Sequence, residues 1–182
     1  MYGLVNKAIA DMVKLRFGED KWQQICKAAA VESLLLSMEV YPDDLTHRLV
    51  KASSEILGLT SAEIMQAFGE FWIQYTTEAG YGELLDMSGD DLPEVLENLD
   101  NLHTRLGVIF PKLKPPSFRS DMIDEQTLTL EYHSEREGLA PMVMGLVKGL
   151  GARLDTDVTI EQTKHREKGD DHDEFSIQHK PH

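Results

Sequence analysis

The feature of the sequence that most constrains its fold is a change of hydrophobic pattern at a proline pair, Pro115 and Pro116. Up to residue 110, apolar residues recur every three or four positions, the period of helices that pack one face onto a core. The two prolines cannot continue a helix, because each lacks a backbone donor and restricts the residue before it. Beyond them, residues 127–134 (TLTLEYHS) alternate with the period of a strand, and 158–163 and 174–179 do so more weakly.

This pattern predicts an α+β fold, with an N-terminal helical lobe followed by a C-terminal lobe of antiparallel strands with one long helix. Thr60 and Glu63 have capping-box spacing, and Pro141 suits the first turn of a helix. The expected helices are 4–17, 20–30, 45–57, 61–75, 92–110 and 141–154. At 182 residues the chain can form one domain of two lobes, which we expect over about 1–65 and 66–182.

The charge and the single cysteine exclude several classes of protein. A formal charge of −14 repels phosphate backbones, so nucleic acid and anionic membranes are not expected as partners. No stretch approaches 18 uninterrupted apolar residues, and the opening MYGLVNKAIADMV lacks the apolar run of a signal peptide. Cys26 is the only cysteine, so no internal disulfide can form. We therefore expect a cytoplasmic protein.

One histidine, His103, lies on the apolar face of the expected helix 92–110. It follows Leu99 by four positions and precedes Leu106 by three, and Asp91 is a plausible N-cap for the helix. An imidazole in this position has two interpretations. It can be a core histidine with a backbone hydrogen bond, or a ligand to a metal or to haem iron.

A second candidate group, Tyr132, Ser134 and Arg136, follows the most regular strand pattern. If this stretch is extended, at about 3.3 Å per residue, the three side chains share one face with Leu128 and Leu130. A guanidinium beside two hydroxyls suits an apolar ligand with an anionic edge, since arginine can grip a carboxylate through two hydrogen bonds. The alternative is that these residues form an ordinary solvated strand end.

Taken together, these residues resemble the H-NOX family, the haem-based nitric oxide and oxygen binding domains related to the sensor domain of soluble guanylate cyclase. The family signature Y-x-S-x-R is present as Tyr132, Ser134 and Arg136, and its proximal histidine matches His103. The proline after that helix matches Pro115 in KPPSF, and the opening MYGLVNKAI resembles the family's N-terminus. The resemblance covers nearly the whole chain and is strongest to the stand-alone cyanobacterial-type members.

The resemblance implies roles for these residues around a haem b (Fe-protoporphyrin IX) held between the lobes. His103 would ligate the iron, the Tyr–Ser–Arg group would hold the propionates, and Pro115 would press on the porphyrin, unless it is a simple linker proline. In oxygen-binding members a tyrosine donates a hydrogen bond to the gas, and the corresponding residue here is Met142, which has no donor. Two other side chains, Trp72 and Tyr2, are alternative hydrogen-bond donors to the gas. The remaining expected cofactor contacts are apolar: Leu4, Val5, Ile73 and Leu146.

We therefore expect a non-enzymatic gas sensor for NO and CO, which signals by release of His103 and movement of the haem and the lobes. The resemblance implies a separate effector, either a histidine kinase or a cyclic-dinucleotide enzyme. Three alternatives remain: an oxygen sensor of the same family, a haem enzyme such as a peroxidase or NO dioxygenase, and a helical interaction module without a cofactor.

Overall fold

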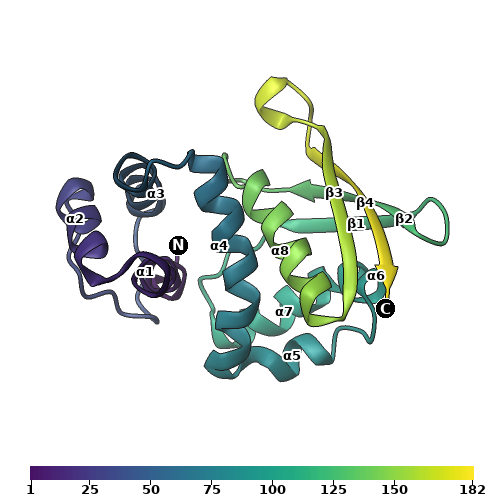
Figure 1. The fold of residues 1–182 in the computed structure, drawn as a ribbon. Coiled ribbons are helices and arrows are strands. Elements are labelled where there is room, and N and C mark those ends of the chain that lie inside the picture. The colour runs from purple at the N-terminus through teal and green to yellow at the C-terminus, as the bar shows by residue number, and fades with distance from the viewer. The chain divides into compact units, whose positions relative to one another are not determined.

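Helices make up the first part of the chain and a four-stranded antiparallel sheet the last, in the computed structural model, which describes residues 1–182 (Figure 1). The predicted α+β class is confirmed. The structure divides into two units, Met1–Phe68 and Gly69–His182, and α4 (Ser61–Thr76) crosses the boundary between them. No helix combines the length and the apolar character needed to cross a membrane.

The first unit contains α1 (Gly3–Phe17), α2 (Glu19–Ala29) and α3 (Asp43–Leu57), close to the expected bounds. Apolar residues at helical spacing, such as Ile9, Met12, Trp22 and Leu49, are almost completely buried. The capping box predicted at the start of α4 is present. The Thr60 N–H donates to Glu63 Oε2 at 2.7 Å, and the Glu63 N–H donates to Thr60 Oγ1 at 3.2 Å.

The second unit places one long helix against the sheet (Figure 1). Its strands have the order β1-β2-β4-β3, and every neighbouring pair is antiparallel. The core consists mainly of apolar residues from α8 and from the alternate positions of β2 and β4. The elements after α4 are a π-helical turn Thr77–Tyr81, α5 (Gly82–Asp86), α6 (Leu92–Glu97), α7 (Leu99–Ile109), β1 (Ser117–Met122), β2 (Thr127–His133), α8 (Ala140–Arg153), β3 (Thr156–Lys164), a 3₁₀ turn Arg166–Lys168 and β4 (Asp173–Pro181).

The single helix predicted over 92–110 is wrong, because the chain forms two helices separated by Asn98. The Asn98 side chain donates to the Glu94 carbonyl at 3.0 Å, where it competes with the regular backbone ladder. The two helices also differ in burial: α6 buries Leu92, Val95 and Leu96, whereas no residue of α7 is fully buried.

The strand β1 was not predicted. Its sequence, SFRSDM, carries few apolar residues, and none of its side chains is fully buried. Its place in the sheet comes from pairing with β2, in a register that sets Phe118 opposite Tyr132. A strand whose pairing supplies most of its stabilisation leaves little trace in a hydrophobic pattern.

Candidate cofactor site

His103 lies on α7 and is half-buried, with its Nδ1 atom buried and without a hydrogen-bond partner. Burial lowers the pKa of His103, and the nearby Asp100 carboxylate offsets part of that effect. The imidazole ring stacks on Phe118, with ring centroids 5.9 Å apart and planes 17° from parallel. A neutral imidazole with an unused nitrogen can coordinate a metal ion.

The apolar face of α7 is only partly covered by the rest of the second unit. Leu99 and Leu102 pack against the core from partly buried positions, Leu106 is half-buried, and Ile109 is 42% exposed. Amphipathic helices of small domains usually bury such a face completely. The half-open face is the one that carries His103.

Asp100, one turn before His103, connects α7 to β1. Its Oδ1 accepts a hydrogen bond from the Phe118 N–H at 2.8 Å, and its Oδ2 accepts one from the Ser117 hydroxyl, also at 2.8 Å. Phe118 in turn contacts the Tyr132 ring, at 5.3 Å between centroids. Asp100 and Phe118 thereby link His103 to Tyr132, and the sequence pattern identified neither.

The signature residues lie at the end of β2, but they do not share an extended strand. The strand ends at His133, and the chain then turns, with the Arg136 N–H donating to Ser134 Oγ at 3.0 Å. The expectation that strand alternation extends to Arg136 is therefore wrong. Tyr132 is 4% exposed, and burial raises the pKa of its phenol.

Two arginines hold this turn in place. Arg136 Nη1 donates to the Lys114 carbonyl at 2.8 Å, which brings the segment before the proline pair beside the signature. Arg166 Nη1 donates to the Ser134 carbonyl and, at 3.3 Å, to the Arg136 carbonyl. The signature is therefore a structured turn, held by the guanidinium of its own Arg136 and by that of Arg166.

The two prolines next to this turn differ in exposure. Pro115, the residue expected to press on the porphyrin, is exposed, whereas Pro116 is half-buried. Pro116 directly precedes Ser117, which is hydrogen-bonded to Asp100. Pro116 is therefore packed in part by the protein itself, and the contact of Pro115 with a porphyrin stays a prediction.

The expected distal residues of the second unit lie on α4 and α8, which approach each other closely at glycines. A Cβ on Gly69 would lie 2.2 Å from the Met142 carbonyl oxygen and 2.7 Å from the Leu146 nitrogen. A Cβ on Gly149 would lie 3.0 Å from Ile73 Cγ1. Trp72, Ile73 and Leu146 contribute to the core cluster, and Met142 is half-buried.

The remaining three expected contacts, Tyr2, Leu4 and Val5, lie in the first unit. Tyr2 forms an isolated bridge with Val40, and the other two are half-buried in α1. Their part in a cofactor site stays a prediction.

Comparison with known proteins shows the family of the chain. The family described as Haem-NO-binding (HNOB) matches residues 2–162. The chain belongs to this family. Among curated HNOB relatives, soluble guanylate cyclase gcy-35 of Caenorhabditis elegans is 37% identical over 186 residues, which cover 98% of this chain and 26% of that protein. Soluble guanylate cyclase gcy-31 of the same organism is 33% identical over 163 residues, which cover 88% of this chain and 23% of that protein. The chain spans about a quarter of the length of these relatives.

Solved H-NOX structures share the fold of this HNOB chain. The H-NOX protein from S. oneidensis in the Fe(II)NO state has a TM-score of 0.89 at 19% identity, covering 99% of both chains. The unliganded Fe(II) H-NOX protein from K. algicida has a TM-score of 0.87 at 20% identity, covering 100% of this chain and 98% of the other. The resemblance inferred from His103 and the Y-x-S-x-R signature is thus confirmed at the level of family and fold.

Proposed function

We propose that this HNOB chain is a gas sensor that holds haem b through His103 and binds NO and CO at ferrous iron. The observation that carries the proposal is the buried, unpartnered Nδ1 of His103 on a helix face that the second unit covers only in part. A buried polar nitrogen without a partner is costly, and a large apolar ligand beside it would cover the open face. The residues therefore fit a haem.

Each candidate residue has a role that its surroundings support. His103 would coordinate the iron, because burial already favours its neutral form. Tyr132 and Ser134 would donate hydrogen bonds to the haem carboxylates, with Arg136 supplying the positive charge. The structured turn holds these groups in place before the ligand arrives. The haem would supply the iron at which a diatomic gas binds.

The choice of gas depends on the side chains of α4 and α8. Met142, Ile73 and Leu146 offer no hydrogen-bond donor, which favours NO and CO, since oxygen depends more on a donor. The Trp72 indole is the one donor of the expected distal group within the second unit. An oxygen-binding sensor would have to use that indole or the Tyr2 hydroxyl.

A change in the position of His103 would be passed to the rest of the protein through α7. His103 is carried by α7, none of whose residues is fully buried, so a change at the imidazole would be able to move this helix. Asp100 would carry that displacement to the start of β1 through its two hydrogen bonds. A ligand can drive such a change only by its differential affinity for the two states.

The chain would act on a separate effector and have no catalytic activity of its own. The family resemblance favours a histidine kinase or a cyclic-dinucleotide enzyme. The curated relatives are soluble guanylate cyclases, which adds a nucleotide cyclase as a third class of effector. A pull-down with one purified enzyme of each class, with and without NO, separates the three.

The first test is the absorption spectrum of the purified ferrous protein. We expect a Soret band that is lost in His103→Gly and recovered on addition of imidazole. The control is His47→Gly, the same substitution at an exposed position of a different helix, α3. Haem binding that is unchanged in His103→Gly would refute the proposal, and a protein that folds without haem would favour the interaction module.

The second test concerns the gas. In air we expect no stable oxygenated spectrum, whereas NO and CO should each shift the Soret band. Met142→Tyr adds a donor and should gain oxygen affinity. A stable oxygenated wild type would make the chain an oxygen sensor, and turnover with peroxide, or with NO plus oxygen, would make it an enzyme.

A further inference from the structure

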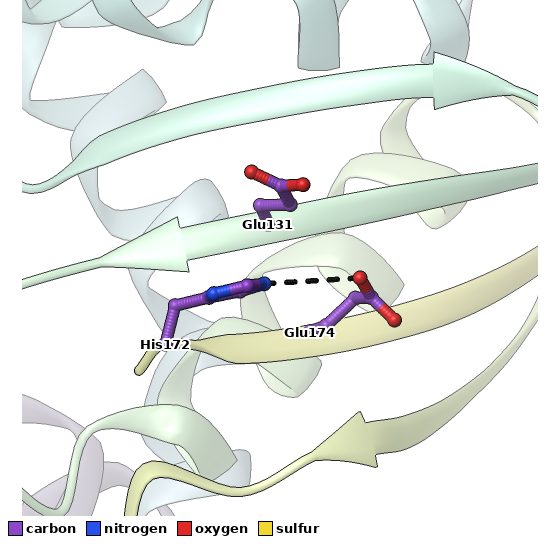
Figure 2. A group of neighbouring side chains, drawn as sticks. All are labelled: Glu131, His172 and Glu174. Atoms are coloured by element: carbon purple, nitrogen blue, oxygen red, sulfur yellow. Dashed lines mark ion pairs between the residues drawn. The ribbon is translucent and has the colours of Figure 1, made fainter. Parts of the chain in front are cut away.

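A cluster of ionisable side chains lies on the opposite face of β2 and β4 from the core. Along β2, Leu130 and Tyr132 are buried in the core, so Glu131 between them projects from the other face. Glu174 is the direct partner of Glu131 on β4, and His172 precedes it by two residues. Figure 2 shows Glu131 on β2 next to His172 and Glu174 at the start of β4, with the ion pair between the last two drawn as a dashed line.

The distances within the cluster are close to those of a metal site. Glu131, His172 and Glu174 each offer one ligand atom, and these atoms lie within 4.8 Å of one another. His172 Nε2 is 3.8 Å from Glu174 Oε2. A tetrahedral zinc ion with bonds of about 2.1 Å sets its ligand atoms about 3.4 Å apart. The ligand atoms therefore need to approach one another by at most about 1.4 Å to reach that spacing.

The surroundings of His172 and Glu174 orient them as a metal site requires. His172 is 7% exposed, and its Nδ1 is buried without a well-formed hydrogen bond. Asp171 Oδ1 lies 2.7 Å from that Nδ1, while Nε2 faces the cluster. A carboxylate behind a histidine is the usual support for a metal-ligating imidazole. Thr163 Oγ1 donates to Glu174 Oε1 at 2.9 Å and fixes the second carboxylate.

The cluster already has a cation beside it, the Lys164 ammonium. Two carboxylates directly opposite each other on neighbouring strands repel. Lys164 Nζ lies 2.6 Å from Glu174 Oε2 and 3.3 Å from His172 Nε2, which is the position of a bridging cation. The lysine side chain is 42% exposed, so it can withdraw into solvent.

A fourth possible metal ligand, His133, lies next to the cluster. The His133 ring centroid is 4.8 Å from that of His172, and His133 Nε2 is 3.4 Å from Glu131 Oε2. Its side chain is 48% exposed and can therefore turn toward the other three. Two imidazoles and two carboxylates form a ligand set suited to zinc.

We propose that Glu131, His133, His172 and Glu174 bind Zn²⁺ on the face of the sheet opposite the core, and that the ion displaces the Lys164 ammonium. The site is separate from His103 and does not depend on haem. Zinc would then join the start of β4 to β2, the strand that leads into the Tyr–Ser–Arg turn.

The test is equilibrium dialysis of the haem-loaded full chain against ZnCl₂, with zinc and iron counted separately by elemental analysis. We expect one zinc per chain. Glu131→Gln combined with Glu174→Gln keeps the side-chain shapes and removes both charges, and it should weaken binding at least about 100-fold. Asp157→Asn is the matched control, because Asp157 forms an exposed pair with His182, at 3.1 Å, away from this cluster.

Lys164→Met distinguishes a zinc site from a simple ion pair. Removal of the competing ammonium should tighten zinc binding about tenfold. It should also make the melting temperature depend on zinc more strongly than in the wild type, as a check that the variant is folded. Absence of bound zinc in the wild type, or a loss of less than tenfold in the double glutamine variant, would overturn the proposal.

Discussion

At the scale of single residues, His103 is held in place by few contacts. The imidazole has no hydrogen-bond partner at Nδ1, so its position depends on the stack with Phe118 and on the helix that carries it. Besides this stack, the Asp100 carboxylate connects the same helix to β1 through two hydrogen bonds. Asp100 therefore controls where His103 can lie relative to the sheet.

Replacing Asp100 should test this control. Asp100→Ala removes both acceptors and leaves the Phe118 N–H without its partner, so we expect a loss of about 1 kcal/mol in unfolding free energy by urea titration. Ser117→Ala removes only one of the two hydrogen bonds and should cost less. If Asp100 positions His103, the ferrous Soret band should shift in Asp100→Ala and not in Ser117→Ala. Equal spectra in the two variants would contradict the positioning role.

At the scale of secondary structure, the contact between α4 and α8 depends on glycine. The two backbones lie so close at Gly69 that no side chain fits between them. The same contact sets Ile73 of α4 beside Gly149 of α8. Glycine is required here for close approach.

Gly69→Ala and Gly107→Ala should change stability in opposite directions. A Cβ on Gly69 forces the helices apart, which should cost about 1–3 kcal/mol of unfolding free energy. A Cβ on Gly107, in α7, meets nothing within 4 Å and should stabilise the helix by about 0.5–1 kcal/mol. Urea unfolding measures both. A neutral Gly69→Ala would show that α4 and α8 can separate freely.

The capping box of α4 makes a pH-dependent contribution. Hydrogen bonds from the Thr60 backbone and hydroxyl hold the pKa of Glu63 below its usual value. A carboxyl with a lowered folded-state pKa stabilises the fold above its ordinary pKa, and this stabilisation is lost as the pH falls through the folded pKa. Glu63→Gln should therefore lower the urea midpoint at pH 7 and have less effect at acid pH. Glu55→Gln, on the exposed part of α3, serves as the control and should show no such trend.

At the scale of the whole molecule, a formal charge of −14 on 182 residues opposes compaction. Added salt screens this repulsion over about 8–10 Å. We therefore expect the melting temperature at pH 7 to rise between 20 and roughly 200 mM NaCl. The rise should shrink at lower pH, as the carboxylates become protonated. A fall with salt would mean that the surface ion pairs outweigh the net repulsion.

The sequence predicted the helices and strands in which apolar residues recur at a regular spacing. The helices of the first unit, β2 and α8 were found because each buries one regular face. The break at Asn98 was missed, since the apolar period continues through it. The strand β1 was missed because it is held by pairing with β2.

In the candidate site, too, only residues that belong to a regular segment could be predicted from the sequence. His103 and Tyr132 could be identified from their own segments. Asp100 is connected to Phe118 18 residues later, and Arg166 reaches back 32 residues to Ser134. Contacts of this kind depend on the folded arrangement of the strands, and a single sequence carries no periodic signal for them.

The break at Asn98 has a consequence for how variants of this protein should be screened. Because α6 buries three residues in the core while no residue of α7 is fully buried, substitutions at the exposed positions of α7 should change a melting curve less than substitutions in α6. A survey that ranks variants by thermal shift would therefore undervalue changes on α7, and the role proposed for this helix has to be tested by assays of output.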